Sequence, residues 1–186
     1  MRILAISGSL CAASPNTILL NAAAALAPEN VEVLVYRGLA DLPHFNPDFD
    51  GDAAHPAVAD FRCQLCKASG VIISTPEYAH GVPGVLKNAL DWLVKSGELY
   101  EKPVAIFSAS PRATFAQASL TVTLSVMFAR LLEDASIMVP LPSKKVDEPG
   151  LIADPCISHA IRSALVTFAH VIGLVEPNRT EMGRCS

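Results

Sequence analysis

Short apolar runs alternate with longer helical patterns along most of the chain. The apolar runs lie near residues 2–7, 31–35, 70–74, 103–107 and 135–139. The helical patterns lie near 16–27, 55–68, 84–96, 115–133 and 154–172. The run GVIIS at 70–74 is rich in β-branched residues and lacks polar alternation, which is typical of a strand buried on both faces. This alternation predicts an α/β fold, in which helices connect the strands of a five-stranded parallel sheet.

The size and composition of the chain agree with one domain. With 186 residues, of which 51% are hydrophobic, the chain is long enough to bury a sizeable core. We predict a single domain over residues 1–175 and a frayed tail over 176–186. No apolar stretch reaches membrane-spanning length in the sequence, and the start MRILAISGS lacks a signal-peptide cleavage pattern. These features lead us to expect a soluble cytoplasmic protein without a membrane partner.

The net charge and the cysteines argue against a nucleic-acid-binding protein and against a disulfide-stabilised one. The formal net charge is −4, and no cluster of Lys and Arg supplies the surface that nucleic-acid phosphates need. The five cysteines are an odd number in a chain without a secretory signal, which argues against a disulfide framework. Cys63 and Cys66 form one CxxC inside a helical pattern, so we predict buried apolar cysteines rather than a metal or redox site.

The loop after the first apolar run has the composition of an anion site. Gly8 and Ser9 form a sharp turn, and Ser14-Pro15-Asn16-Thr17 begins a helical pattern. Proline suits a first helical turn, hydroxyl and amide side chains cap free backbone N–H groups, and the helix dipole favours a phosphate there. The other interpretation is that Ser14 and Asn16 only cap the helix and Ser9 only makes the turn.

Two further loops follow the third and fourth apolar runs. The segment TPEYAHGVPGVLKNALDW, residues 75–92, places Pro, Glu, Tyr and Gly just before a helical pattern, as expected of a loop that grips a ligand. The segment SASPR, residues 108–112, follows the fourth run. Parallel strands end at the same edge of a sheet, so we expect all three loops to meet there.

The chain resembles the NADPH-dependent FMN reductase family. The family signatures are roughly GSLRxxSxNxxL and PEYNxxxPGxLKNAxDW, and the chain has GSLCAASPNTIL and PEYAHGVPGVLKNALDW. DLPHFNPDFD and FSASPR extend the resemblance over most of residues 1–140. The resemblance implies a flavodoxin-like three-layer sandwich with strand order 2-1-3-4-5 and a ligand between strands 1 and 3.

The resemblance also assigns cofactor-binding residues. It implies that the FMN phosphate is held by Ser9, Ser14, Asn16 and Thr17. It implies that the ring is flanked by Pro76, Glu77, Tyr78 and Ala79, and that the third loop contributes Ser108 and Ser110. Cys11 lies in the phosphate loop where relatives have an arginine, so we predict weakened FMN binding, and Ala79 replaces an asparagine. His80 is a candidate for contact with the substrate, or else is an exposed loop residue. Arg112 is a candidate for contact with the phosphates of NAD(P)H or for partial replacement of the missing phosphate partner, or else is a surface residue.

The implied activity is hydride transfer from NADPH or NADH to flavin N5, and then reduction of a quinone, free flavin or similar acceptor. The flavin carries this chemistry, so no catalytic acid, base or metal ligand is expected of the protein. Relatives form homodimers or homotetramers, and the helix with Lys87, Asn88, Asp91 and Trp92 is assigned to packing and assembly. Two alternatives are a flavodoxin-like electron carrier and a flavin-free binding protein. A low-molecular-weight tyrosine phosphatase would need Cys-x5-Arg, but Thr17 stands where that arginine belongs.

Overall fold

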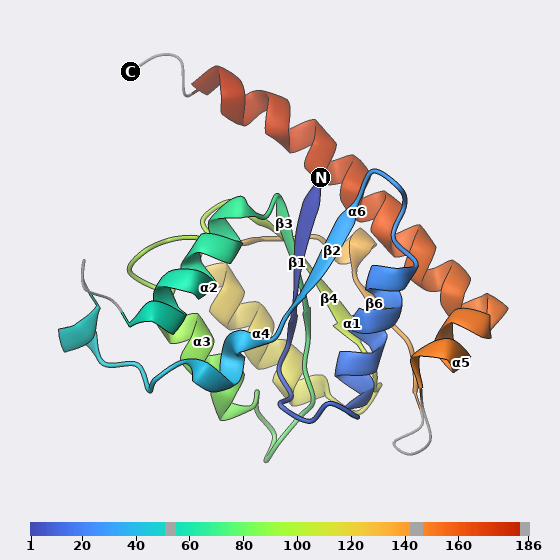
Figure 1. The fold of residues 1–186 in the computed structure, drawn as a ribbon, viewed down its shortest axis with the longest axis horizontal. Coiled ribbons are helices and arrows are strands. Elements are labelled where there is room, and N and C mark those ends of the chain that lie inside the picture. Colours follow the sequence, from blue (N-terminus) through green and yellow to red (C-terminus); the bar gives the residue numbers. More distant parts are fainter. Residues whose placement is uncertain (51–54, 142–146, 183–186) are drawn as a thin grey trace.

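A parallel sheet forms the centre of the molecule (Figure 1). The computed structural model describes residues 1–50, 55–141 and 147–182, with side chains as far as Leu174. The strands are β1 (Arg2–Ser7), β2 (Glu32–Tyr36), β3 (Gly70–Ser74), β4 (Pro103–Ser108), β5 (Arg130–Leu131) and β6 (Ile137–Met138). They pair in parallel in the order β2-β1-β3-β4-β5, and β6 also pairs with β4. The predicted flavodoxin-like strand order is therefore confirmed.

The fifth strand differs from its prediction because it is split. We predicted a helix over 115–133 and a strand over 135–139, but the helix ends at Val126. The two short strands β5 and β6 flank a 3₁₀ turn, η3 (Glu133–Ala135). Within this gap the Ser136 hydroxyl accepts from the Ile106 N–H at 2.9 Å and donates to the Leu132 carbonyl at 2.8 Å. A side chain thus replaces the ladder hydrogen bonds that the turn removes.

Helices cover both faces of the sheet and complete the predicted three layers (Figure 1). On one face lie α1 (Pro15–Ala25), α5 (Glu148–Ala153) and α6 (Pro155–Met182). On the other lie α2 (Pro56–Lys67), α3 (Gly84–Asp91) and α4 (Thr114–Val126). Successive strand residues point to opposite faces, so Ala105 and Phe107 pack in the first core while Val104 and Ile106 pack in the second.

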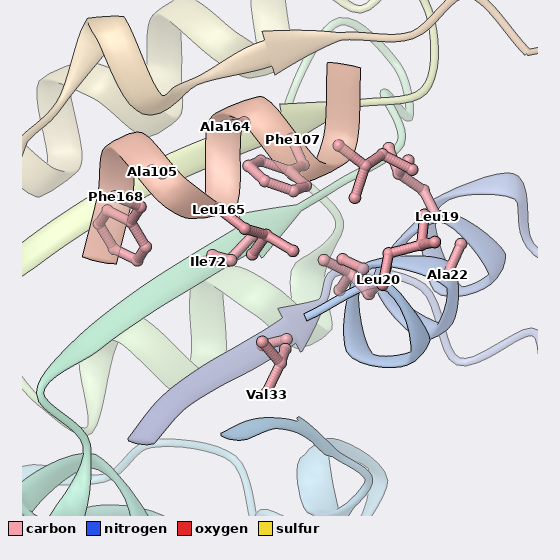
Figure 2. Close-up of a cluster of buried hydrophobic side chains, with 14 of the residues drawn as sticks. Leu19, Leu20, Ala22, Val33, Ile72, Ala105, Phe107, Ala164, Leu165 and Phe168 are labelled. Carbon is pink, nitrogen blue, oxygen red and sulfur yellow. The ribbon is translucent and has the colours of Figure 1, made fainter. Parts of the chain in front are cut away.

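The core between the sheet and α1/α6 is shown in Figure 2, where Phe168 lies at one end of the cluster and Leu19 and Ala22 lie at the other. Its α6 members Ile161, Leu165 and Phe168 are fully buried. The helical pattern predicted over 154–172 forms one helix, α6, which continues to Met182. The short helix α5 precedes it in a segment for which we predicted a loop, and Asp147 caps α5 by accepting from the Gly150 N–H at 2.9 Å. Asp154 caps the start of α6 by accepting from the Cys156 and Ile157 N–H groups. The predicted tail from residue 176 lies within α6 as far as Met182, and residues 183–186 lie outside the described part.

Helix α6 is an exception to the expectation that no stretch reaches membrane-spanning length. The segment Pro155–Leu174 has 20 residues and is long and apolar enough to cross a membrane, by length and composition only. Its apolar residues Ile161, Leu165 and Phe168 pack against the sheet, as in the core helix of a globular protein.

The CxxC pair contradicts its prediction. Cys63 and Cys66 do share one face of α2, but both are exposed, because α2 buries Val58, Phe61 and Leu65 instead. The 3.6-residue period places positions 58, 61 and 65 on the face opposite the cysteines. The spacing identified a shared face correctly, and only the packing shows which face it is.

Trp92, at the end of α3, belongs to the core between α3 and the loop after β2. It is 1% exposed, donates from Nε1 to the Pro43 carbonyl at 2.9 Å and packs edge-on against Phe45. Asn88 binds the same loop through the Pro43 carbonyl and the Phe45 N–H. These two residues therefore serve packing, while Lys87 and Asp91 form an ion pair on the surface of α3.

Candidate functional site

The loops that follow β1, β3 and β4 meet at the carboxyl edge of the sheet, the lower edge in Figure 1. Together with Leu141 they line a cleft of about 520 Å³ that is open to solvent. This volume lies within the range of about 300–1,000 Å³ that is typical of small-ligand sites. The cleft brings together nine of the residues singled out in the sequence: Ser9, Cys11, Ser14, Asn16, Pro76, Glu77, Tyr78, Ser110 and Arg112.

The first two loops are joined at Gly8. Its N–H donates to the Ser74 carbonyl at 2.8 Å, which continues the ladder between β1 and β3 by one residue. A Cβ at position 8 would stand 2.4 Å from Oγ1 of Thr75 and 2.9 Å from its Cβ. Glycine is therefore required here by close approach of the two loops, in addition to its role in the turn.

The start of α1 presents unused donors to the cleft. Ser14 occupies the N-cap position and is 7% exposed, yet its hydroxyl makes no capping bond, and Pro15 follows in the first turn as predicted. The first intrahelical bond runs from the Ile18 N–H to the Ser14 carbonyl at 2.9 Å, so the N–H groups of Asn16 and Thr17 precede it. The Asn16 Oδ1 accepts from the Ser74 hydroxyl at 3.0 Å, which leaves the amide Nδ2 as a donor. Free N–H groups at the positive end of a helix favour an anion.

The Thr17 side chain does not line the cleft, although we expected it to help hold the FMN phosphate there. Its hydroxyl lies 2.8 Å from the Ser7 hydroxyl and donates to the Cys11 carbonyl at 3.4 Å. The residue is 3% exposed and faces a second cavity of about 140 Å³ beneath the first loop, which it shares with Cys11 and Arg37. The side chain therefore holds the loop in shape, and only the backbone N–H of Thr17 is available to a ligand.

Glu77 connects the second loop to the third. Its Oε2 accepts from the Ala116 N–H at 3.0 Å, in the first turn of α4, and its Oε1 lies 3.2 Å from Nδ1 of His80. The hydrogen bond from Ala116 is the main reason that the pKa of Glu77 is lowered, with the His80 side chain adding to the effect. The sequence carries no signal for this capping, because α4 is distant from Glu77 in the chain.

The Glu77 carboxylate should stabilise the fold in a pH-dependent way. Because its folded-state pKa is lowered, its contribution is present above the unfolded-state value of about 4.3 and is lost as pH falls through the folded-state pKa. We expect Glu77→Gln to be less stable than the wild type at pH 7, and the difference to shrink below about pH 4. Urea unfolding midpoints of both proteins across this range measure it. A difference that stays constant with pH would contradict the role of the charge.

Ala79 and His80 form the tip of the second loop and do not line the cleft. The Tyr78 and Gly81 backbones exchange two hydrogen bonds of 3.0 Å, and both residues between them have positive φ, 49° and 60°. This is the pattern of a type I′ turn, which usually takes Asn or Gly. The His80 ring meets Phe115 edge-on at 4.5 Å. The turn thus places His80 against the start of α4, while Tyr78 lines the cleft.

The third loop is held by its own side chains. The Ser108 hydroxyl donates to the Ser110 carbonyl at 3.0 Å and accepts from the Gln117 side chain at 2.6 Å. Ser108 is 5% exposed and faces away from the cleft, toward a cavity beside α4. Ser110 and Arg112 line the cleft, and the Ser110 hydroxyl accepts from the Arg112 N–H at 3.2 Å. Of the two serines expected at the ligand, Ser110 is therefore the one placed to contact it.

Comparisons with known proteins agree with this site. Residues 1–141 match the NADPH-dependent FMN reductase family. The chain is 30% identical to a quinone reductase of Escherichia coli, over 95% of this chain and 97% of that one. It is 31% identical to an NAD(P)H-dependent FMN reductase of Pseudomonas aeruginosa, over 89% of this chain and 91% of that one. The flavoenzyme NAD(P)H:(acceptor) oxidoreductase FerB of Paracoccus denitrificans has the same fold, with a TM-score of 0.75 and 25% identity over 92% of this chain and 97% of that one.

The matched range contains all three cleft loops and the strands β1 to β6, so the family likeness covers the site as well as the sheet. The chain belongs to the NADPH-dependent FMN reductase family and is an oxidoreductase that uses FMN and NAD(P)H.

Proposed function

We propose that this protein oxidises NAD(P)H and reduces a quinone, a free flavin or a similar small acceptor, with FMN bound in the three-loop cleft. The observation that carries the proposal is the meeting, in one cleft, of the donor-rich start of α1 with the loops after β3 and β4. This is the topological switch point, where open α/β sheets bind their ligands.

The residues in the cleft fit such a cofactor. The buried Ser14 hydroxyl has no capping bond, and the N–H groups of Asn16 and Thr17 lie beside it, as a phosphate requires. We assign the phosphate to this end, together with Ser9. Pro76, Glu77, Tyr78 and Ser110 are among the other lining residues and would flank the ring. When bound, FMN supplies the hydride chemistry, and the protein supplies position and exclusion of water.

An anaerobic titration tests the proposed function. Purified protein is mixed with FMN, and absorbance near 450 nm is followed while NADPH or NADH is added and then a quinone. We expect flavin to bind, to bleach with the nicotinamide and to recover with the quinone. Binding without bleaching would identify an electron carrier instead. If no flavin binds, the proposed function is wrong.

We also propose that the protein is a homodimer or homotetramer that associates through an apolar surface on α4 and its surroundings. This α4 surface consists of six exposed residues: Val94, Tyr100, Phe115, Val122, Val126 and Phe128. Phe115, Val122 and Val126 recur at helical spacing on the outer face of α4, and an apolar hollow of about 380 Å³ lies between α4 and the end of α3. A second copy bound here would stand beside Phe115 and His80, at the mouth of the cleft.

A charge on the α4 surface should disrupt this assembly. Val126 is 71% exposed, so Val126→Glu should leave the isolated chain folded but place a desolvated charge in the interface. We expect the variant to have the mass of a single chain by light scattering after gel filtration. Val166→Glu, at a 56% exposed position on α6, is the matched control and should keep the wild-type mass. A monomeric wild type, or equal dissociation by both variants, would rule out this interface.

We propose that the enzyme works in the cytoplasm. Four cysteines in the described part of the chain, Cys11, Cys63, Cys66 and Cys156, are exposed free thiols. Exposed thiols persist in reducing compartments and are oxidised outside them. Cell fractionation with an antibody against the protein tests this, and recovery in the membrane or extracellular fraction would contradict it.

A further inference from the structure

Of the two charged side chains that line the cleft, one is bound by other protein groups and the other is not. Two lining residues are ionised at neutral pH, Glu77 and Arg112. Glu77 accepts from the Ala116 N–H and pairs with His80, so its charge is already engaged. The Arg112 guanidinium makes no hydrogen bond or ion pair with any residue that the structure describes, although its backbone N–H is bound to Ser110. The cleft therefore contains one cation whose side chain is available to a ligand.

The start of α1, which also lines the cleft, offers an anion only neutral donors. The start of α1 offers the Ser14 hydroxyl, the Asn16 amide and two backbone N–H groups, all of which are neutral. Cys11, which lines the cleft from the same loop, is exposed and carries no basic side chain. A phosphate monoester carries nearly two negative charges at neutral pH, and charge-assisted hydrogen bonds to it are about twice as strong as neutral ones. The first loop supplies donors and a helix dipole but no full positive charge.

We propose that Arg112, from the third loop, supplies the positive charge that binds the phosphate of FMN at the start of α1. This assignment rests on the proposed function. Arg112 lines the same cleft as Ser9, Cys11 and Ser14. Its backbone is held in place, because Pro111 restricts the chain before it and Ser110 accepts from its N–H at 3.2 Å. Arg112 therefore contributes a positive charge, from a held backbone position, to the same cleft that the start of α1 lines.

Arg37 is the competing cation, and its surroundings argue against it. It faces the smaller cavity beneath the first loop with Thr17 and Cys11, outside the cleft itself. Its guanidinium donates to the Asn21 side chain at 2.8 Å, so it is already held one turn further along α1 than Thr17. Arg37 thus provides a matched control: an exposed arginine near the same loop that does not line the cleft.

The experiment compares FMN with riboflavin, which has the same ring system and no phosphate. Dissociation constants are measured by quenching of flavin fluorescence for the wild type, Arg112→Ala and Arg37→Ala, and circular dichroism confirms that each variant is folded. We expect Arg112→Ala to weaken FMN binding about ten- to a hundredfold. Riboflavin binding should change by less than about twofold, since the lost contact is to the phosphate. Arg37→Ala should bind both flavins as the wild type does.

A second variant tests whether a positive charge from the first loop can replace the charge of Arg112. Cys11→Arg introduces a guanidinium from the first loop into the same cleft. Combined with Arg112→Ala, it should restore most of the lost FMN affinity and leave riboflavin binding unchanged. Rescue of this kind requires that the missing element is positive charge at the phosphate, and a general change in loop structure would not produce it.

Four results would overturn the assignment. These are unchanged FMN binding by Arg112→Ala, equal weakening of FMN and riboflavin, a phosphate-specific loss in Arg37→Ala, or failure of Cys11→Arg to rescue. A raised Michaelis constant for NADPH with an unchanged FMN constant would place Arg112 at the nicotinamide nucleotide instead. Failure of the proposed function is distinguishable, because then the wild type itself binds no FMN.

Discussion

Replacing Phe168 by alanine is expected to lower the free energy of unfolding by about 3–5 kcal/mol, the range for removal of a buried aromatic ring. Phe168 lies in α6, is fully buried, and its ring packs beside Gly70 of the central strand β3 (Figure 2). A cavity at this point would separate α6 from the sheet. Urea denaturation followed by circular dichroism measures the change.

The matched control is Phe49→Ala, because Phe49 is 68% exposed. Removing a ring from the surface should change the free energy of unfolding by no more than about 0.5 kcal/mol. Residues 142–186 lie beyond the family match, so this pair of variants also tests whether α6 belongs to the domain proposed for residues 1–175. Equal and small effects of both substitutions would show that α6 contributes little to the fold.

Replacing Gly8 by alanine is expected to disrupt the cleft as well as the fold. The new Cβ would lie 2.4 Å from Oγ1 of Thr75, so the first and second loops must move apart. Overpacking of this kind costs about 1–3 kcal/mol. The displaced α1 start should weaken FMN binding by at least about tenfold, which corresponds to the loss of one good hydrogen bond. Flavin fluorescence titration and urea denaturation measure the two effects.

Gly84 supplies the control for this substitution. It lies at the start of α3, and a Cβ added there meets nothing within 4 Å. Gly84→Ala should therefore leave FMN binding unchanged and raise stability by up to about 1 kcal/mol, since alanine is the better helix former. Adding Thr75→Ala to the Gly8→Ala variant removes the nearest atom and should restore part of the affinity. Wild-type FMN binding by the Gly8→Ala variant would show that the two loops adapt without penalty.

The apolar pattern of the sequence was sufficient to place the first four strands. Each buried run has β-branched and aliphatic residues over a length typical of strands, and the helical patterns between them require parallel pairing. The prediction of the fifth strand was wrong because the run near 135–139 does not form the edge strand of the sheet alone. Arg130–Leu131 pairs with β4 first, and only a turn closed by Ser136 returns the chain to the same strand. No periodicity of apolar residues in the sequence indicates such an interruption of a strand.

The cleft was predictable at the level of its loops and less so at the level of side chains. Ser9, Ser14, Asn16 and Ser110 line it as expected. Thr17 and Ser108 are turned away, because each hydroxyl is used by its own loop, at Ser7 and Ser110 respectively. Short polar side chains bind neighbouring backbone or ligand equally well, and their composition does not distinguish the two uses.

The fold class, the strand order by resemblance and the three loops of the site could all be predicted from the amino-acid sequence. Those features depend on local periodicity, turn residues and signature spacing, all of which act over a few neighbouring positions. The folded arrangement was needed to show that Glu77 caps α4, that Cys63 and Cys66 face solvent, and that Arg112 lines the cleft without a side-chain partner among the described residues. Each of these depends on which groups from distant segments meet, and the energy of a side chain is set by the partners that folding places around it.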